Sequence, residues 1–556
     1  MAAAGGAKPS SSKKSKKAVL NKSRKGNLHV FQDAPIYDLL KYFDRAPDQW
    51  AARYILIFST IILKSAVGLG SYLGEGQLPI HGDFEAQRHW MEITNHLPVS
   101  QWYFFDLEYW GLDYPPLTAY HSYIFGKLGL FLNWSWFALN DSRGIENPGI
   151  KYFMRFLVII SDFIVYGPAL IHVLSLIGKR FNMNRIDHIV FTAAFLCQPG
   201  LILIDNGHFQ YNSVMLGLFL FAVAELIREN YILASIWFVL AINFKQMALY
   251  YAPFIFTYIL ANMFYNYYDV SKSYRQLIRS FNFAKVFLVG IAVLLTQVVL
   301  LLPFIWISFE NGFTFDILRQ IVIRVFPFQR GLFEDKVANF WCTTNLVIKY
   351  RELFTLPQLT RLLLLLTLAS IIPPNLLIAW KLLMNKKFTK NSTHRIVILL
   401  LGFAITSWGF FLFSFQVHEK SVLVPLMPTL LLALTRDRFD LVLIQWIINV
   451  TSFSMYPLLK KDNLVLQYFT CLLVSNWIMG ALNVKKNTLM IPKDSLFWKL
   501  IIVSSYVAML TYHISDQFLA PPARYPDLWL ILNTTISFAY FGIFWLWLLY
   551  RAYVLN

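Results

Sequence analysis

The chain has 556 residues, of which 57% are hydrophobic and 17% aromatic, with a mean hydropathy of +0.50. This composition excludes an ordinary soluble globular domain. The formal net charge of +18 does not indicate a nucleic-acid partner, because many of the basic residues lie in a polar N-terminal tail and in short loops between apolar runs. We therefore expect an all-α polytopic membrane protein whose first partner is the lipid bilayer.

The N-terminal tail is strongly basic. Residues 1–25 contain eight Lys or Arg and no acidic residue. The tail lacks the apolar core of a signal peptide, so the first apolar run, 54–73, is expected to act as an uncleaved signal anchor. By the positive-inside rule the tail stays in the cytosol. It serves either as a disordered orientation signal, which its composition favours, or as a lipid- or nucleic-acid-binding arm.

Apolar runs long enough to cross about 30 Å of hydrocarbon recur along the rest of the chain. The predicted membrane spans are 54–73, 152–178, 188–204, 213–227, 231–243, 247–263, 286–308, 361–380, 396–415, 421–435, 439–459, 464–483, 500–513 and 527–550. The run 117–133 carries His121, Lys127 and two glycines, so we expect it to lie along the membrane interface instead. That choice leaves about fourteen spans.

The basic loops test this assignment. With 117–133 removed, the Lys- and Arg-rich loops 179–187, 264–285, 381–395 and 484–499 all join the tail on the cytosolic side. Both termini are then cytosolic, with 1–53 as a tail and 54–556 as one transmembrane unit. The same assignment gives a first luminal loop at 74–151, containing membrane-parallel helices, and a second large luminal loop at 309–360.

The first luminal loop begins with HGDFEAQRHWMEIT, which gathers charges in an otherwise apolar chain. Asp83 precedes a helical pattern in which Glu85 and His89, and Arg88 and Glu92, are four residues apart and share helix faces. Asp83 is either the cap of this helix or a reactive carboxylate, and the residues themselves favour the cap.

A second carboxylate follows in the same loop. In DYPPL the double proline holds Asp113 and Tyr114 in an extended turn. The surrounding tryptophans and tyrosines suit an interfacial belt or a platform for a sugar. Two carboxylate-bearing elements near the membrane surface strengthen the functional reading of Asp83.

Two further polar blocks fall on the same side of the membrane. DNGHFQYN carries Asp205, His208 and Gln210, which fit a helix cap or contacts to sugar hydroxyls better than a metal site. FQVHEK places His418 and Lys420 at the end of a span, where cations suit a phosphate or form a snorkelling cluster. The three cysteines, Cys197, Cys342 and Cys471, have no ligand spacing, and we expect neither a metal nor another cofactor.

Together these groups suit transfer of a sugar from a lipid phosphate. One carboxylate can take a proton from an attacking hydroxyl, cations can hold the phosphate, and a phosphate leaving group needs no general acid. A nucleotide-sugar enzyme would predict a soluble domain, which is not visible. A lipid-linked sugar flippase or transporter also places polar groups in a multi-span chain, although the chain has no evident internal repeat.

Long motifs also carry a resemblance, through GDFEAQRHWMEIT, WGLDYPPLTAYHS, LIDNGHFQYNSVMLG, FKQMALYYAP, FPFQRGLFEDKVANFWC, FSFQVHEKSVL and DQFLAPPARYPDLWLILN. They are similar to those of the endoplasmic-reticulum glucosyltransferases that use dolichyl-phosphate glucose, of the GT-C class. DFEAQRHW and GLDYPPLTAYHS resemble the branch that adds the first glucose, in α-1,3 linkage, to the nine-mannose dolichyl-diphosphate oligosaccharide of N-glycosylation. The branch that adds the second glucose shares the same chemistry.

The resemblance implies roles for particular residues. Asp83 would be the general base, and His418, with Lys420, would contact the donor phosphate. Positions matched without a fixed role, and expected to contact substrate, are Glu85, Asp113, Tyr114, Asp205, His208 and Gln210. The resemblance further implies the GT-C fold, an inverting reaction without a metal, and an active site facing the lumen of the endoplasmic reticulum.

Overall fold

The computed structural model describes residues 31, 34–43, 48–78, 81–264, 274–310, 312, 314–326, 336–388, 392–414, 417–482, 491–492 and 495–555. Within these residues the only extended pairing is one isolated bridge between Phe264 and Phe281, and the regular structure is otherwise helical. The predicted all-α class is confirmed. The basic stretch 1–25 and most of FPFQRGLFEDKVANFW lie outside the described residues.

Eight helical segments of the described chain are long and apolar enough to cross a membrane. They are α3 (Asp48–Gly68), α6 to α7 (Pro148–Arg180), α8 to η6 (Arg185–Phe209), α14 (Phe283–Glu310), α18 (Leu356–Met384), α19 (Thr393–Phe413), α24 (Leu496–Phe518) and α25 (Leu528–Val554). Length and composition therefore identify a multi-pass membrane protein.

Shorter helices occupy the other predicted spans. Four are apolar: α10 (Asn212–Ile227), α11 (Tyr231–Phe244), η7 with α12 (Gln246–Ala261) and α23 (Val465–Ile478). The two remaining predicted spans are 421–435, which overlaps α20 (Leu423–Leu432), and 439–459, which overlaps α21 and α22 (Arg438–Ser454, Tyr456–Lys461). Among the described residues each predicted span thus contains helix, although α3 ends at Gly68 and not at residue 73, and α23 ends at Ile478 and not at residue 483.

Both predicted luminal loops contain helices of their own. The first holds α4 (Asp83–His96), η3 (Val99–Gln101), α5 (Pro116–Leu132) and η4 (Trp134–Phe137), and the second holds α15 (Asp316–Val325), α16 (Phe340–Thr344) and α17 (Tyr350–Leu353). The remaining short elements are α2 (Pro35–Leu40), η2 (Lys41–Phe43), η5 (Asp162–Tyr166), α9 (Pro199–Leu201), α13 (Tyr274–Arg279), η9 (Lys386–Phe388), η10 (Glu419–Val422) and η11 (Ala433–Thr435). α5 begins directly after Pro115 and is not among the candidate spans of the described chain.

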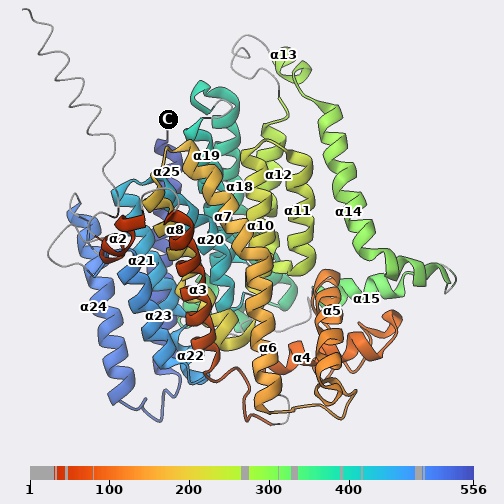
Figure 1. The fold of residues 1–556 in the computed structure, drawn as a ribbon. Coiled ribbons are helices and arrows are strands. Elements are labelled where there is room, and N and C mark those ends of the chain that lie inside the picture. The colour runs from red at the N-terminus through yellow and green to blue at the C-terminus, as the bar shows by residue number, and fades with distance from the viewer. Residues whose placement is uncertain are drawn as a thin grey trace, which may run out of the picture.

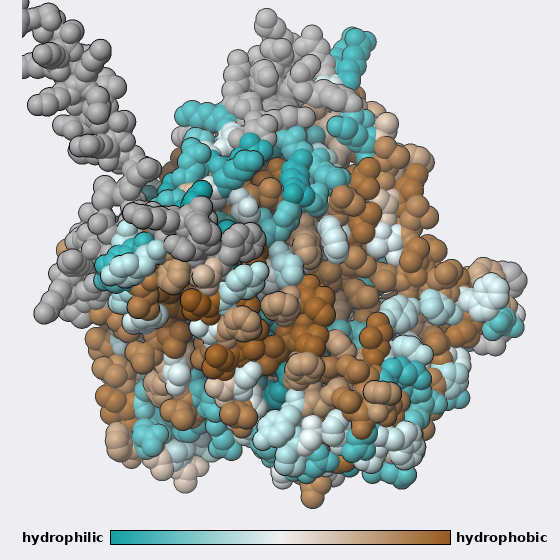
Figure 2. All heavy atoms as spheres, viewed as in Figure 1, coloured by the Kyte–Doolittle hydropathy of each residue, from teal (hydrophilic) through white to brown (hydrophobic). Residues whose placement is uncertain are grey.

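The bundle has two distinct ends (Figure 1). α4 lies at one end, while α13 and the C-terminus lie at the other. α15 projects sideways from the bundle near the C-terminal end of α14. Figure 2 shows hydrophobic residues gathered across the middle of the visible face and hydrophilic residues toward both ends. This distribution is that of a bundle whose waist faces lipid.

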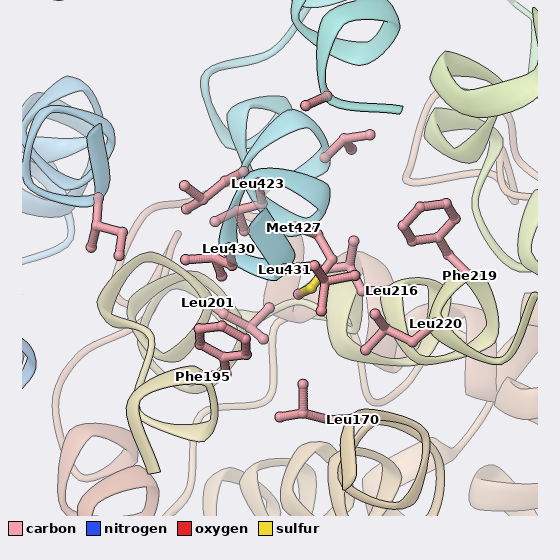
Figure 3. Close-up of a cluster of buried hydrophobic side chains, with 14 of the residues drawn as sticks. Leu170, Phe195, Leu201, Leu216, Phe219, Leu220, Leu423, Met427, Leu430 and Leu431 are labelled. Atoms are coloured by element: carbon pink, nitrogen blue, oxygen red, sulfur yellow. The ribbon is translucent and has the colours of Figure 1, made fainter. Parts of the chain in front are cut away.

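A packed apolar cluster fixes the helices that carry the site (Figure 3). Side chains of α10, α20 and the α8–α9 segment meet in it, among them Leu201, Leu216, Leu423 and Met427, all buried. In a membrane, helix association relies on such close packing because lipid is as apolar as the side chains. Leu201 directly precedes η6 and Leu423 directly follows η10, so this cluster holds η6 and η10 in a fixed relation.

Candidate active site

Asp83 is the first residue of α4, but its carboxylate does not cap that helix. Gly82 occupies the N-cap position, and no side chain caps the first turn. A Cβ at Gly82 would lie 2.3 Å from the carbonyl oxygen of Leu73, so only glycine permits this close approach of two backbones. The helix-cap alternative for Asp83 is therefore wrong, and the carboxylate is available for other contacts.

Three side chains from two other elements converge on a single oxygen of Asp83. His208 Nε2 lies 3.1 Å from Oδ2, and Gln210 Nε2 donates to the same oxygen at 2.5 Å. The Lys420 ammonium forms an ion pair with it as well. None of the hydrogen bonds given for the described residues reaches Oδ1, and 18% of the Asp83 side chain is exposed. The structure thus brings four sequence-predicted site residues together.

Electrostatics keep this carboxylate ionised. Burial alone would raise the pKa of Asp83, but the Lys420 charge and the His208 hydrogen bond outweigh burial and hold the pKa well below its usual range. At neutral pH Asp83 is a carboxylate with one occupied and one unoccupied oxygen. Such a group can accept a proton from a hydroxyl placed within hydrogen-bond reach of Oδ1.

A second layer of polar side chains holds Gln210. Its Oε1 accepts from Lys245 Nζ at 2.9 Å and from the Tyr114 hydroxyl at 3.4 Å. Lys245 also donates to Asn212 Oδ1 at 2.7 Å and lies over the Tyr114 ring, 5.1 Å from its centre. Asp113 is near enough for its charge to act on Lys245. The DYPPL turn therefore reaches the Asp83 cluster through Gln210 and Lys245.

Asp205 has a structural role in the described contacts. Its two oxygens accept from the backbone N–H and the side-chain amide of Asn212, at 3.1 and 2.9 Å, and from the Ser213 N–H at 2.7 Å. These bonds satisfy N–H groups at the start of α10. The cap alternative is confirmed for Asp205, whereas His208 and Gln210 of the same motif reach Asp83.

Glu85 belongs to a different cluster. Arg88 donates two hydrogen bonds of 2.7 Å to its carboxylate. The predicted helix is confirmed, so Glu85 and His89 share one face and Arg88 and Glu92 another. Arg88 Nη2 also lies 2.8 Å from Glu92, whereas His89 Nδ1 contacts Glu92, at 3.1 Å. The Arg88 guanidinium binds the Glu85 carboxylate in a bidentate manner, so Glu85 is already paired three residues away from Arg88 on the same helix. Substrate contact by Glu85 stays a prediction.

His418 lies two residues before Lys420 and caps the short helix η10. It is exposed, and its backbone N–H is 3.3 Å from the Ser421 hydroxyl. His418 is therefore at the surface, two residues before the cation that pairs with Asp83. Its predicted contact with a donor phosphate stays a prediction.

Two residues of the cluster were not among the predicted site residues. Lys245 occurs in the motif FKQMALYYAP, for which the sequence indicated no role. Asp462, in KKDN between α22 and α23, lies with its Oδ2 2.6 Å from His208 Nδ1. The available signal was topology, because the predicted spans put residues 460–463 on the same side of the membrane as Asp83. In the described chain, no group of three or more His, Cys, Asp or Glu side chains is arranged to hold a metal ion.

The fold and the site define a multi-pass helical membrane protein with an acid–cation cluster at one end of its bundle. The model of the ALG6, ALG8 glycosyltransferase family matches residues 59–547, and the chain belongs to this family.

Similar proteins share nearly the full length. The chain is 44% identical to the dolichyl pyrophosphate Man9GlcNAc2 alpha-1,3-glucosyltransferase of Saccharomyces cerevisiae, covering 97% of each chain. It is 45% identical to a probable enzyme of the same name in Schizosaccharomyces pombe, covering 93% of this chain and 95% of that protein. With the mouse enzyme of that name it shares 35% identity, over 90% and 97% of the two chains.

Proposed function

We propose that this protein transfers glucose, in α-1,3 linkage, to the dolichyl-pyrophosphate-linked Man9GlcNAc2 oligosaccharide. The near full-length likeness to enzymes of that name supports the reaction and its acceptor. The donor is dolichyl-phosphate glucose, and the site acts on the luminal side of the endoplasmic-reticulum membrane. The single observation that carries the mechanism is the asymmetric carboxylate of Asp83, with three donors on Oδ2 and none on Oδ1 among the described residues.

The reaction needs one base. The acceptor mannose hydroxyl places its hydrogen on Oδ1 of Asp83, and its oxygen forms a bond to the anomeric carbon of glucose. The bond from that carbon to the dolichyl phosphate breaks, and the phosphate leaves with the electron pair. The hydroxyl proton ends on Asp83, and the anomeric configuration inverts in this single displacement. The leaving phosphate is a weak base and needs no proton.

Lys420 has two tasks in this scheme. Without donor it pairs with Asp83, and in the donor complex its ammonium turns to the phosphate together with His418. This exchange removes a positive charge from Asp83, which raises the pKa of the base at the moment when it must accept a proton. Donor binding thereby prepares Asp83 for the acceptor.

The arrangement of the helices supports the proposed topology. Fourteen spans put both termini in the cytosol, 1–53 as a tail and 54–556 as one catalytic unit with the GT-C fold. α4 and the C-terminus at opposite ends of the bundle agree with a luminal site and a cytosolic C-terminus. The loops 74–151 and 309–360 then form the luminal surface over the site, with α5 at the membrane interface.

The test uses full-length protein purified in detergent, with two acceptors assayed side by side. Asp83→Asn keeps the shape but not the base, and we expect kcat to fall by about 10²- to 10⁴-fold. Asp106→Asn is the matched control, since Asp106 is an acid of the same loop paired only with Arg143 among the described ion pairs. The control should turn over at nearly the normal rate.

Three results would contradict the proposal. Turnover retained by Asp83→Asn would remove Asp83 as the base. A preference for the acceptor that already carries one glucose would assign the chain to the second-glucose reaction. Movement of labelled lipid in vesicles without a new glycosidic bond would favour a transporter instead.

A further inference from the structure

His208 lies between two carboxylates. Its Nδ1 is 2.6 Å from Asp462 Oδ2, and its Nε2 is 3.1 Å from Asp83 Oδ2. The side chains of His208 and Asp462 are each 1% exposed, whereas that of Asp83 is 18% exposed. The chain of contacts therefore runs from the exposed base into the protein and ends at a carboxylate that no substrate can reach.

The backbone around His208 is fixed from three sides. Arg155 Nη2 donates to the carbonyl oxygen of Gly207 at 2.6 Å, and the Leu73 N–H donates to the His208 carbonyl oxygen at 3.3 Å. A Cβ at Gly207 would lie 2.9 Å from a Leu464 methyl group, so the segment also packs closely on the stretch that follows Asp462. With the backbone held and both ring nitrogens beside carboxylates, the open question for His208 is which ring nitrogens carry a proton.

Asp462 settles that position. It ends α22, where its backbone N–H bonds to the Leu458 carbonyl oxygen. His208 is the only hydrogen-bond partner given for its side chain among the described residues. A carboxylate this deeply buried is costly unless a donor meets it, so Nδ1 must carry a proton. Because Nε2 also faces a carboxylate, the geometry fits a doubly protonated His208.

We propose that Asp462 is a positioning residue for the glucosyl transfer, acting through His208 to anchor Oδ2 of Asp83 and to leave Oδ1 for the acceptor hydroxyl. The inference rests on the proposed function, in which Asp83 is the base. Asp462 itself touches no substrate. Its negative charge stabilises the His208 cation, and that cation in turn favours the ionised form of Asp83.

The expected direction of the pH effect follows from the groups around His208. Asp83 on α4, Asp462 after α22 and Lys420 on η10 face its ring, and Arg155 on α6 binds the neighbouring carbonyl oxygen. Removing the Asp462 charge makes the His208 cation less stable. The pKa of Asp83 then rises, and the acidic limb of the kcat/KM profile moves toward neutral pH.

The test compares Asp462→Asn with the full-length normal enzyme in detergent. We expect kcat to fall by about 10- to 100-fold, as for partners that orient reactive groups, with little change in the KM for dolichyl-phosphate glucose. The acidic limb should move upward by about one pH unit. Asp462→Glu, which keeps the charge, should restore the normal limb. Asp516→Asn is the matched control, because Asp516 is a buried carboxylate paired with Lys460 away from Asp83, and should leave the limb in place.

A double-mutant cycle separates positioning from folding. On a His208→Gln background, Asp462→Asn should cause no further loss of kcat, because its route to Asp83 is gone. If Asp462→Asn does not fold, His208→Gln alone gives the same reading, since its acidic limb must also move upward. The proposal would be overturned if the acidic limb of the kcat/KM profile does not move in His208→Gln. It would also be overturned if the losses of kcat from His208→Gln and Asp462→Asn are fully additive. Turnover by Asp83→Asn would instead refute the proposed base, so the two failures are distinguishable.

Discussion

Two carboxylate clusters share the helix α4, and they are built in opposite ways. Arg88 is fully buried between Glu85 and Glu92 and uses each of its five N–H groups. The bonds go to Glu85 (two), Glu92, the Ser142 hydroxyl and the Trp136 carbonyl oxygen. In the Asp83 cluster, at the start of the same helix, three side chains contact Oδ2 of Asp83, and no described bond reaches Oδ1.

The difference shows how charges serve structure and chemistry in one loop. The Arg88 cluster ties α4 to η4 and to the stretch before α6, and every charge in it has a partner, so it holds this loop together. The Asp83 cluster has its donors on one oxygen and no described bond on the other, in a side chain that is 18% exposed. In the proposed reaction the second oxygen accepts the proton of the reacting hydroxyl. Replacements in the first cluster should affect folding, and replacements in the second should affect turnover.

The largest effect is expected from Arg88→Leu. It leaves Glu85 and Glu92 buried without their shared cation, which should lower the free energy of unfolding by about 3–5 kcal/mol. The melting temperature of the purified protein measures this change. Arg143→Leu removes an exposed partner of Asp106 in the same loop and serves as the control, with a loss below about 1 kcal/mol. A normal melting temperature for Arg88→Leu would show that the cluster does not hold the loop.

Lys420→Gln should act on turnover. Loss of the ammonium should raise the KM for dolichyl-phosphate glucose by about 10- to 100-fold, the value of about 1.5–3 kcal/mol for a charged hydrogen bond. The Lys420 charge lowers the pKa of Asp83, and the proposed base can accept a proton only when ionised, so the acidic limb of kcat/KM should move to higher pH in the variant. Steady-state kinetics at several pH values measure both effects.

Lys460→Gln is the control for Lys420→Gln, because Lys460 is half-exposed and pairs with Asp516 at 2.7 Å. It should change neither the donor KM nor the pH profile. A Lys420→Gln variant with a normal donor KM would assign the phosphate to other groups. A limb that moves to lower pH would contradict the contact between Lys420 and Asp83.

The sequence predicted the all-helical class and the positions of the helices, because apolar runs recur along the chain, and eight helical segments of the described chain have the length that a bilayer requires. It also predicted Asp83, His208, Gln210 and Lys420 as site residues, since topology placed their motifs on one side. It gave Asp83 and Glu85 different roles, but it did not predict the contacts that place these two residues of one charged motif in different clusters. The cluster around Glu85 and Arg88 depends on Tyr109, Ser142 and Gly144, which only the folded loop brings to α4.

Asp462 and the π-helical η6 show the other limit. Local periodicity does not reveal that residues 202–209 widen into a π-helix, in which the Gln210 N–H bonds to the Asp205 carbonyl oxygen. This turn sets the direction of His208. KKDN has the composition of an ordinary polar turn, and the role of its aspartate depends on a contact with a residue 254 positions away in the chain. Pairings of this range follow from packing, not from a motif.

The smallest change in stability is expected from Glu92→Gln. Its dependence on pH tests whether the Arg88 cluster, unlike the Asp83 cluster, serves to hold the fold together. Burial would raise the pKa of Glu92, but the bond to His89 and the Arg88 charge lower it to about 2. A carboxylate with a depressed pKa stabilises the fold fully above its unfolded pKa, about 4.3, and loses this contribution as the pH falls toward 2. At pH 7 the variant should be about 1–2 kcal/mol less stable than the normal protein.

Melting curves at pH 7, 4 and 3 check this expectation. The gap between the normal protein and Glu92→Gln should narrow at pH 4 and narrow further at pH 3. There the unfolded chain takes up a proton at Glu92 while the folded protein, with a pKa of about 2, stays mostly ionised, so lowering the pH favours unfolding of the normal protein. The amount of glucose transferred per folded molecule at pH 7 should stay close to normal, unlike that of any Asp83 variant. A gap independent of pH would mean that Glu92 acts by shape alone, and that the Arg88 cluster is not held by its charges.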